Sequence, residues 1–409
     1  MEGGRVTRLA RRRWATAAEL LQLVNAEPGI TRREAAERLG LSSGAATELV
    51  DRLKRLELLN ESRAEHTGPG RPTTILEPHE QGPLVLIIGL RASGWELRLS
   101  DLAGRLTALT DAPYEDDRPE AVLTTIAAAV AGAVDDAEPR IRCVVVSAAG
   151  PVSGTALGQL SARHWLELLD LQRLTAGIPA ERRPPLLVGN DATLAGVAEA
   201  RTGASKDTSV AVHLMVATGI GGVLLLNGEP ALGAHGTGGE FGHLPFADPA
   251  LECTCGSYGC WDLAVDGRAL ARHRGEPEPA DPEDYARRLL DDLESGRSRS
   301  GDNRGAVALA AGAFGRGIAG LVNAHDPDVI TLGGLGPQLR RTAPEAFDRA
   351  YRSGLMTVHQ RQPPPVLDSV HGADGPTRGA AYLGIDHITS PAALDRWAGN
   401  EPETDTAAR

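Results

Sequence analysis

The sequence has no run approaching the roughly 18 consecutive apolar residues that a membrane-spanning helix needs. The basic residues near its N-terminus are not followed by an apolar run of the signal-peptide kind, so we expect a cytoplasmic protein with no membrane partner. Lysine occurs twice against 40 arginines, a bias that says little about function. With 409 residues, 42% of them apolar, the chain is long enough for two or three domains with buried cores.

Cysteine is scarce, with four residues in the whole chain. Cys143 begins an apolar run and is predicted to be a buried strand residue. Cys253, Cys255 and Cys260 lie within eight residues of one another, and His243 precedes them by ten positions. In a cytosolic chain such a cluster indicates a metal before disulfides. One His and three Cys predict a closed, structural zinc (Zn2+) site, and metal-free thiols are the alternative.

Charge is distributed unevenly along the chain. The net charge is −12, but residues 1–75 carry 13 basic and 10 acidic residues, which gives +3. The remainder carries 29 basic and 44 acidic residues, which gives −15. A mildly basic head on an acidic body is consistent with a head that binds nucleic acid, although +3 alone also fits chance.

The N-terminal region has the pattern of a helix-turn-helix. Apolar residues recur at helical spacing over 15–27, and Pro28-Gly29 ends that helix. Thr31 to Glu34 forms a capping box that starts a second, short helix. Gly40 breaks this helix, and a third follows from about Ser43 to Leu56. A short helix, a glycine turn and a second helix are the signature of the motif.

A strand, a Gly/Pro loop and a second strand over residues 58–76 predict a β-hairpin wing, and Arg71 near its tip is placed to enter a minor groove. The third helix is the predicted recognition helix, because small and hydroxyl side chains at its start permit close approach to base edges. The residues predicted to contact DNA are Ser42, Ser43, Ala45, Thr47, Glu48, Arg52 and Arg71. The alternative is a three-helix interaction module without DNA.

The rest of the chain alternates apolar runs with helical patterns and predicts an α/β body. The strand candidates are Leu84–Ile88, Cys143–Val146, Leu186–Val188, Val210–Val216, Val223–Leu226 and Val329–Leu332, and the helix candidates include 119–135, 192–201, 282–294 and 306–324. We expect a winged helix-turn-helix over 1–78, a first lobe over 79–200, a second lobe with the zinc site over 201–388, and a flexible tail over 389–409.

Taken together, these motifs resemble the ROK family of repressors, open reading frames and sugar kinases, and the whole chain is similar to its repressor branch. Two features carry the resemblance. They are the spacing from His243 through Cys253 and Cys255 to Cys260, and the Gly-Arg-Pro wing at 70–72. It implies an actin/hexokinase-like (ribonuclease H-like) body of two lobes with a cleft between them. It also implies a double-stranded DNA operator and a sugar or sugar phosphate effector as partners.

The resemblance further implies roles for individual residues. Asp191 matches the catalytic base of the kinases, and Ala217–Gly222 and Leu332–Gly334 match their second phosphate loop and adenosine-side motif. The implied sugar-binding residues are Gly150, Asn190, Asp191, Glu240, His243 and Asp262, the last being one methylene shorter than the family's Glu. Tight turns without a ligand are the alternative for the glycine runs, and a helix N-terminal carboxylate is the alternative for Asp191.

The first phosphate loop departs from the kinase pattern. Such kinases have an Asp-x-Gly-Gly-Thr loop after the first strand, and counting back from Asp101 and Gly104 places Gly89–Ser93 at that position. The metal-binding carboxylate is missing and side chains replace both glycines, which should remove most of the rate enhancement of phosphoryl transfer. The sequence therefore predicts a sugar-responsive repressor with a degenerate kinase body, in which Asp191 is a vestigial base.

Two other functions stay open at this point. One is an ATP-dependent sugar kinase with an accessory N-terminal domain, and the other is a regulator that a protein partner controls through the body. A helix-turn-helix reader is expected to bind two half-sites as a homodimer, and the resemblance also allows a homotetramer.

Overall fold

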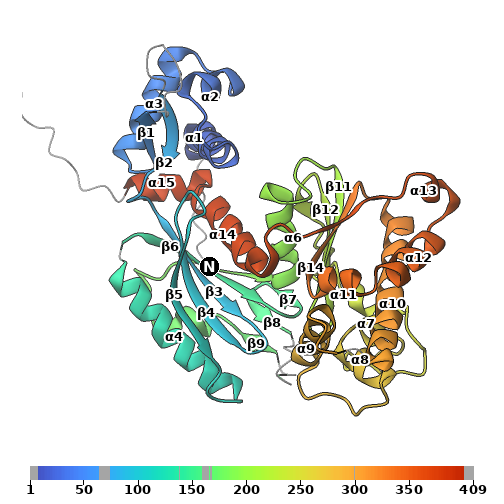
Figure 1. Cartoon of the computed structure of the whole chain (residues 1–409). Coiled ribbons are helices and arrows are strands. Elements are labelled where there is room, and N and C mark those ends of the chain that lie inside the picture. The colour runs from blue at the N-terminus through green and yellow to red at the C-terminus, as the bar shows by residue number, and fades with distance from the viewer. Residues whose placement is uncertain are drawn as a thin grey trace, which may run out of the picture.

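The computed structural model describes residues 8–63, 74–137, 139–158, 165, 168–298 and 300–399, with the backbone alone for residues 8–13. A small, mainly helical head lies on one lobe of a two-lobed α/β body (Figure 1). Residues 64–73 lie outside this description, so the predicted wing tip and Arg71 are not placed.

The head contains α1 (Arg8–Ala26), α2 (Arg32–Arg38), α3 (Ser43–Arg55) and the antiparallel strands β1 (Leu59–Arg63) and β2 (Thr74–Pro78). The predicted capping box is present, because the Thr31 hydroxyl accepts from the Glu34 amide while the Glu34 carboxylate accepts from the Thr31 amide. The box fixes the start of α2, and the glycine turn at Gly40, with its positive φ, lies between α2 and α3.

The first lobe is built on a five-stranded sheet with the order β10-β6-β3-β4-β5. Strands β3, β4 and β5 form an antiparallel meander, and β6 and β10 add to it in parallel. Its strands are β3 (Leu84–Leu90), β4 (Gly94–Ser100), β5 (Leu106–Pro113), β6 (Ile141–Ala148) and β10 (Leu186–Asn190). Helix α4 (Pro119–Asp136) covers one face through its buried Val and Ile residues. A small sheet of β7 (Val152–Ser153), β8 (Ala156–Leu157) and β9 (Leu169–Asp170), followed by α5 (Arg173–Ala176), extends the lobe.

The second lobe has a sheet with the order β13-β12-β11-β14-β15. Its strands are β11 (Val210–Val216), β12 (Ile220–Leu226), β13 (Glu229–Pro230), β14 (Val329–Gly334) and β15 (Val366–Asp368). Its helices are α7 (Asp262–Val265), α8 (Gly267–His273), α9 (Pro282–Glu294), α10 (Gly301–His325), α11 (Gly336–Thr342), α12 (Pro344–Gly354) and α13 (Thr357–Arg361), with short 3-10 turns at Phe241–His243 and Gly372–Asp374. Helix α10 is long and apolar enough to cross a membrane by length and composition, but most of its apolar stretch is buried as the core helix of this lobe.

Two helices lie between the lobes, α6 (Asp191–Thr202) and α14 (Gly375–Ile388), and they pack against each other (Figure 1). The Glu199 carboxylate of α6 accepts hydrogen bonds from the Ser369 hydroxyl at 2.6 Å and the His371 amide at 2.9 Å. Arg201 and Asp386 add a bidentate ion pair between the two helices. Both places where the chain crosses between lobes are thus tied to α6.

The C-terminal region corrects two predictions. Helix α14 was assigned to the second lobe but packs on strands β3 and β6 of the first lobe. Residues 391–399, assigned to a flexible tail, form helix α15 (Pro391–Gly399), which packs against α1. The reason is burial, because Leu394 is fully buried and Trp397 donates from its indole nitrogen to the Leu56 carbonyl at 2.8 Å. The rest of the predicted tail lies outside the described residues.

One hydrophobic core runs through the head, the first lobe and the C-terminal helices. Among its buried members are Trp14, Leu53 and Leu76 from the head, Val85, Cys143 and Val145 from the first sheet, and Ala380, Ile385 and Leu394 from α14 and α15. Cys143 is the buried strand residue that the sequence predicted, and burial raises the pKa of its thiol to about 12. The head is therefore packed onto the body and is not linked to it by a flexible tether.

Candidate functional site

Helix α3, the predicted recognition helix, begins with a capped, exposed turn. The Ser42 hydroxyl accepts from the Ala45 amide at 3.3 Å and forms the N-cap. Ser43, Ala45 and Glu48 are exposed, whereas Ala46, Val50 and Leu53 are buried against the head. Helical periodicity therefore separates a packing face from a free face, and the free face carries the small residues that were predicted to contact DNA.

Two predicted DNA-binding residues have other contacts within the head. The Arg52 guanidinium carbon lies 3.6 Å from the centre of the Trp14 ring, a cation–π contact between α3 and α1. The Thr47 hydroxyl donates to the Ser43 carbonyl at 2.8 Å. Arg52 therefore stabilises the packing of the head.

In the body, Asn190 links two of the predicted sugar-binding segments. Its side-chain oxygen accepts from the Thr193 amide and its side-chain nitrogen donates to the Gly150 carbonyl, both at 3.0 Å. Asn190 is thus the N-cap of α6, and Asp191 is the first residue of the helix. Asn190 supplies the side-chain cap, and Asp191 lies in the first turn, so the helix N-terminal carboxylate that was the alternative for Asp191 also fits this geometry.

Asp191 is an acid whose protonation changes near neutral pH. Burial raises the pKa of its carboxyl group to about 7, and the negative charges of Glu283 and Glu240 raise it further, against a 2.7 Å hydrogen bond from the Ala192 amide. Glu283 lies in the first turn of α9. The sequence predicted a helix over 282–294, but it carries no signal that this helix places Glu283 near Asp191, so Glu283 was missed.

The remaining sugar-binding candidates converge on His243. Its Nε2 lies 3.9 Å from a Glu240 oxygen, and its Nδ1 lies 3.7 Å from a carboxylate oxygen of Asp262. Asp262 is almost completely buried and accepts from the Ile220 amide at 2.6 Å. Asp262 therefore fixes the turn after β11 as well as facing the imidazole, and burial raises the pKa of its carboxyl group.

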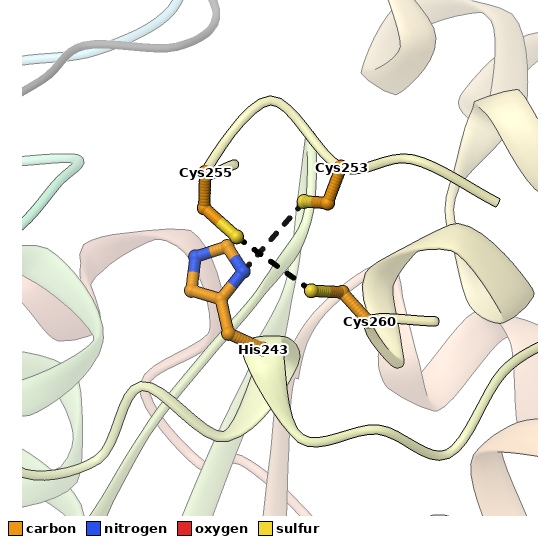
Figure 2. Close-up of side chains that lie close together, drawn as sticks. All are labelled: His243, Cys253, Cys255 and Cys260. Atoms are coloured by element: carbon orange, nitrogen blue, oxygen red, sulfur yellow. Dashed lines mark hydrogen bonds between the residues drawn. The ribbon is translucent and has the colours of Figure 1, made fainter. Parts of the chain in front are cut away.

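His243 and the three clustered cysteines bring their donor atoms together (Figure 2). All four atoms lie within 4.8 Å of one another. The Cys253 sulfur is 3.8 Å from His243 Nδ1, and the sulfurs of Cys255 and Cys260 are 3.7 Å apart. A tetrahedral zinc with Zn–S bonds of about 2.3 Å sets its sulfurs about 3.8 Å apart, so the donor set and its spacing fit that ion.

The segment that was predicted to be a degenerate first phosphate loop is a tight β3–β4 hairpin in which the Arg91 amide donates to the Gly94 carbonyl. A Cβ atom on Gly89 would lie 2.8 Å from Cγ of Glu96. Glu96 is buried, accepts from the Thr377 hydroxyl at 2.8 Å and pairs with Arg98 at 2.8 Å. The space that an aspartate at position 89 would need is thus filled by a carboxylate that is already neutralised.

The second glycine loop keeps a turn between β11 and β12. Gly219 passes directly over Asp262, since a Cβ atom there would lie 2.9 Å from a carboxylate oxygen. Arg268 donates to the Thr218 carbonyl at 3.4 Å and pairs with the buried Asp266. Gly333, at the end of β14, lies beside the buried imidazole of His213 in the neighbouring strand β11. Burial lowers the pKa of this imidazole to about 4.

Comparison with known families matches both parts of the chain. The ROK family profile matches residues 96–387, and the profile described as winged helix-turn-helix DNA-binding matches residues 16–59. The glucokinase of Streptomyces coelicolor (strain ATCC BAA-471 / A3(2) / M145) is 32% identical over 232 residues, which cover 53% of this chain and 71% of that protein. A Caldicellulosiruptor sp. (strain Rt8B.4) protein named "Putative xylose repressor" is 25% identical over 321 residues, 74% of this chain and 79% of that protein.

Two solved structures are similar to this chain. A ROK family transcriptional regulator, described as a homologue of the E. coli MLC protein, superposes with a TM-score of 0.75 at 20% identity and covers 96% of this chain and 100% of that one. A ROK family glucokinase from Streptomyces griseus, in complex with glucose and AMPPNP, superposes with a TM-score of 0.60 at 25% identity and covers 73% and 98%. The predicted fold class, a winged helix-turn-helix with an actin/hexokinase-like body, is confirmed.

The raised pKa of Asp191 predicts a pH-dependent gain in stability for Asp191→Asn. The unfolded carboxyl group ionises near pH 4 and the folded one near pH 7, so its charge destabilises the fold increasingly between these values and fully above pH 7. Asn keeps an oxygen acceptor for the Ala192 amide and carries no charge. We expect the variant to gain about 2–4 kcal/mol at pH 8 and less than half of that at pH 5, measured by urea unfolding.

The control is Asp348→Asn on the exposed surface of α12, which should change stability by less than about 0.5 kcal/mol at either pH. An Asp191→Asn gain that is the same at pH 5 and pH 8 would show that the carboxyl group does not titrate in this range.

Proposed function

The chain belongs to the ROK family, and on that premise we propose that it is a sugar-responsive, DNA-binding transcriptional repressor whose kinase-like body binds its ligand without phosphorylating it. The observation that carries the proposal is the free face of α3, where exposed small residues lead a capped helix whose other face is buried. Repression, as opposed to activation, is proposed from the similarity to the xylose repressor named above.

The start of α3 is suited to a major groove. Gly44 has open space around the position of a Cβ atom, so no contact within the chain requires a glycine there. A residue without a side chain at an exposed helix start permits close approach of the backbone to another molecule, here double-stranded DNA. The groups offered to base edges are the hydroxyls of Ser42, Ser43 and Thr47, the methyl group of Ala45 and the carboxylate acceptor of Glu48. Arg71 is proposed to enter the minor groove.

The proposed effector is a sugar or sugar phosphate in the cleft, contacted by Gly150, Asn190 and Asp191 from the first lobe and by Glu240, His243 and Asp262 from the second. A ligand that contacts both lobes changes the angle between them and with it the placement of the head. In a homodimer or homotetramer, this changes the spacing of the two heads that bind the two half-sites of the operator. To empty an operator that is mostly occupied, the ligand must prefer one state by roughly 10⁴-fold. The site of action is the cytoplasm, where operator and sugar meet.

The proposed cofactor is a structural zinc ion held by His243, Cys253, Cys255 and Cys260. Bound there, zinc supplies a fixed cross-link and no open coordination position. The cross-link holds the His243 ring, and therefore the neighbouring Glu240, in place at the edge of the cleft.

Ala45→Glu tests DNA binding. A carboxylate on the exposed face of α3 repels the phosphate backbone while keeping good helix propensity, so we expect at least a tenfold loss of affinity for the operator at unchanged stability. The measurement is a footprint and a binding titration on the DNA upstream of the gene that encodes this protein, with thermal unfolding of each variant measured in parallel. Ala108→Glu on the exposed strand β5 adds the same charge to the body and should leave DNA affinity within about twofold. Equal affinities of Ala45→Glu and the unaltered protein would contradict the assignment of α3.

Sugar kinase activity is the second candidate function, because relatives named glucokinase are 32% identical and the pKa of Asp191 suits a general base at neutral pH. We expect calorimetry with a panel of hexoses and amino sugars to detect binding of at least one of them. Coupled ATP turnover with the same sugars should stay at background, because Glu96 fills the space above Gly89 in the first phosphate loop. Robust turnover would replace the repressor proposal. Turnover that Asp191→Asn does not change would come from a contaminant.

Metal analysis tests the zinc assignment. The purified protein should contain about one zinc per chain, and Cys255→Ser should lower this content and the thermal stability together, since metal binding contributes free energy of folding. Cys143→Ser is the matched control, because Cys143 lies in β6, more than 100 residues before the cysteine cluster. This substitution should leave the zinc content unchanged. A full zinc content in Cys255→Ser would remove Cys255 from the ligand set.

A further inference from the structure

Three elements of the head meet at one carboxylate, that of Glu61 in β1. Its Oε2 accepts a hydrogen bond from Nζ of Lys54, in the last turn of α3, at 3.1 Å. Its Oε1 lies 3.4 Å from a guanidinium nitrogen of Arg32, the first residue of α2. We call Arg32, Lys54 and Glu61 the hairpin triad.

The backbone holds the hairpin triad together. Leu76 of β2 is paired with Glu61, and its amide donates to the Ile30 carbonyl, directly before α2, at 2.8 Å. The start of α2 is therefore bound to the same hairpin that carries Glu61. The side chain of Glu61 is 15% exposed, whereas those of Arg32 and Lys54 are 39% and 37% exposed. The carboxylate thus lies inside the head, and both cations reach solvent.

The hairpin triad carries more positive than negative charge. Oε1 of Glu61 is buried and has no hydrogen-bond partner within the described residues, so the nearby guanidinium of Arg32 compensates it by charge. Two positive groups and one negative group give the triad a net charge of +1. A second anion on the exposed side would therefore be attracted by Arg32 and Lys54 and repelled by Glu61.

The hairpin triad flanks the helix that is proposed to bind DNA. Lys54 follows Thr47 by seven residues, or two helical turns, so both lie on the same side of α3. Arg52, which was predicted to contact DNA, is stacked on Trp14 instead. With the start of α3 in a major groove, Lys54 is placed to reach the phosphate backbone beside that groove. This step rests on the proposed function.

We propose that Arg32 and Lys54 bind the phosphate backbone of duplex DNA and that Glu61 competes with the phosphates for these two cations. Contacts between cations and phosphates supply most of the affinity that is independent of sequence. A carboxylate at such contacts weakens binding to a duplex of any sequence. The base contacts made by the start of α3 then contribute a larger share of the total affinity.

The test is the salt dependence of DNA binding by the full chain, measured by fluorescence anisotropy with a duplex of random sequence. Glu61→Gln keeps the shape of the side chain and removes its charge. We expect about threefold tighter binding at low salt, the effect of one unit charge roughly 6 Å from a phosphate in water. The plot of log affinity against log salt should steepen by roughly 0.9 per bound head between roughly 50 and 200 mM salt. Lys54→Gln should flatten it by a similar amount.

Glu27→Gln is the matched control. Glu27 pairs with Arg38, the last residue of α2, at 2.6 Å, so this variant also removes a carboxylate from an arginine, but at the other end of the helix. Its salt dependence should equal that of the unaltered protein. Thermal unfolding of each variant separates a changed DNA contact from a changed fold.

Two outcomes overturn the proposal alone. If the unaltered protein binds the duplex and Glu61→Gln binds it no more tightly, Glu61 only ties the hairpin to the helices. If Lys54→Gln leaves the salt dependence unchanged, the cations of the hairpin triad do not meet phosphates. Failure of the unaltered protein to bind any duplex at low salt would overturn the proposed function, and this inference with it.

Discussion

The docking of α15 between the head and the first lobe is the contact on which the rest of the structure depends. Leu394 is fully buried in a core that also contains Trp14 and Leu53 of the head and Val145 of the first sheet. Hydrogen bonds from Trp397 to Leu56 and from Trp14 to Asp395 add direction to this apolar contact. Because protein cores are close-packed, the orientation of α3 relative to the first lobe is set by packing.

In the proposed mechanism, this attachment divides the molecule into two bodies that rotate against each other. The head and the first lobe form one, and the second lobe forms the other, with α6 and α14 between them. Glu199 holds the chain where it returns from the second lobe, so rotation of one body relative to the other is confined to a few residues at this crossing. The proposed sugar residues come from both lobes, and a ligand that contacted both would bias such a rotation.

Sequence patterns predicted the features that are encoded locally. The Thr31–Glu34 capping box, the glycine turn and the spacing from His243 to Cys260 each lie within one short segment, and each has its expected geometry. Features that depend on distant residues were not predictable. The filling of the space above Gly89 depends on the strand pairing that brings Glu96 opposite it, and the effect of Glu283 on Asp191 depends on how α9 packs. The tail prediction for 391–399 was wrong because a short helix with two apolar anchors is stable only through its tertiary contacts.

The position of α15 also has a consequence for biosynthesis. The last described strand of the head ends at Pro78, yet the core of the head is completed by Leu394, which the ribosome adds more than 300 residues later. Synthesis at 5–20 residues per second leaves the head without this support for roughly 15–60 s. A nascent or prematurely terminated chain therefore carries a helix α3 that is not yet locked to its body, and full attachment of the head marks a chain that has been translated past Leu394.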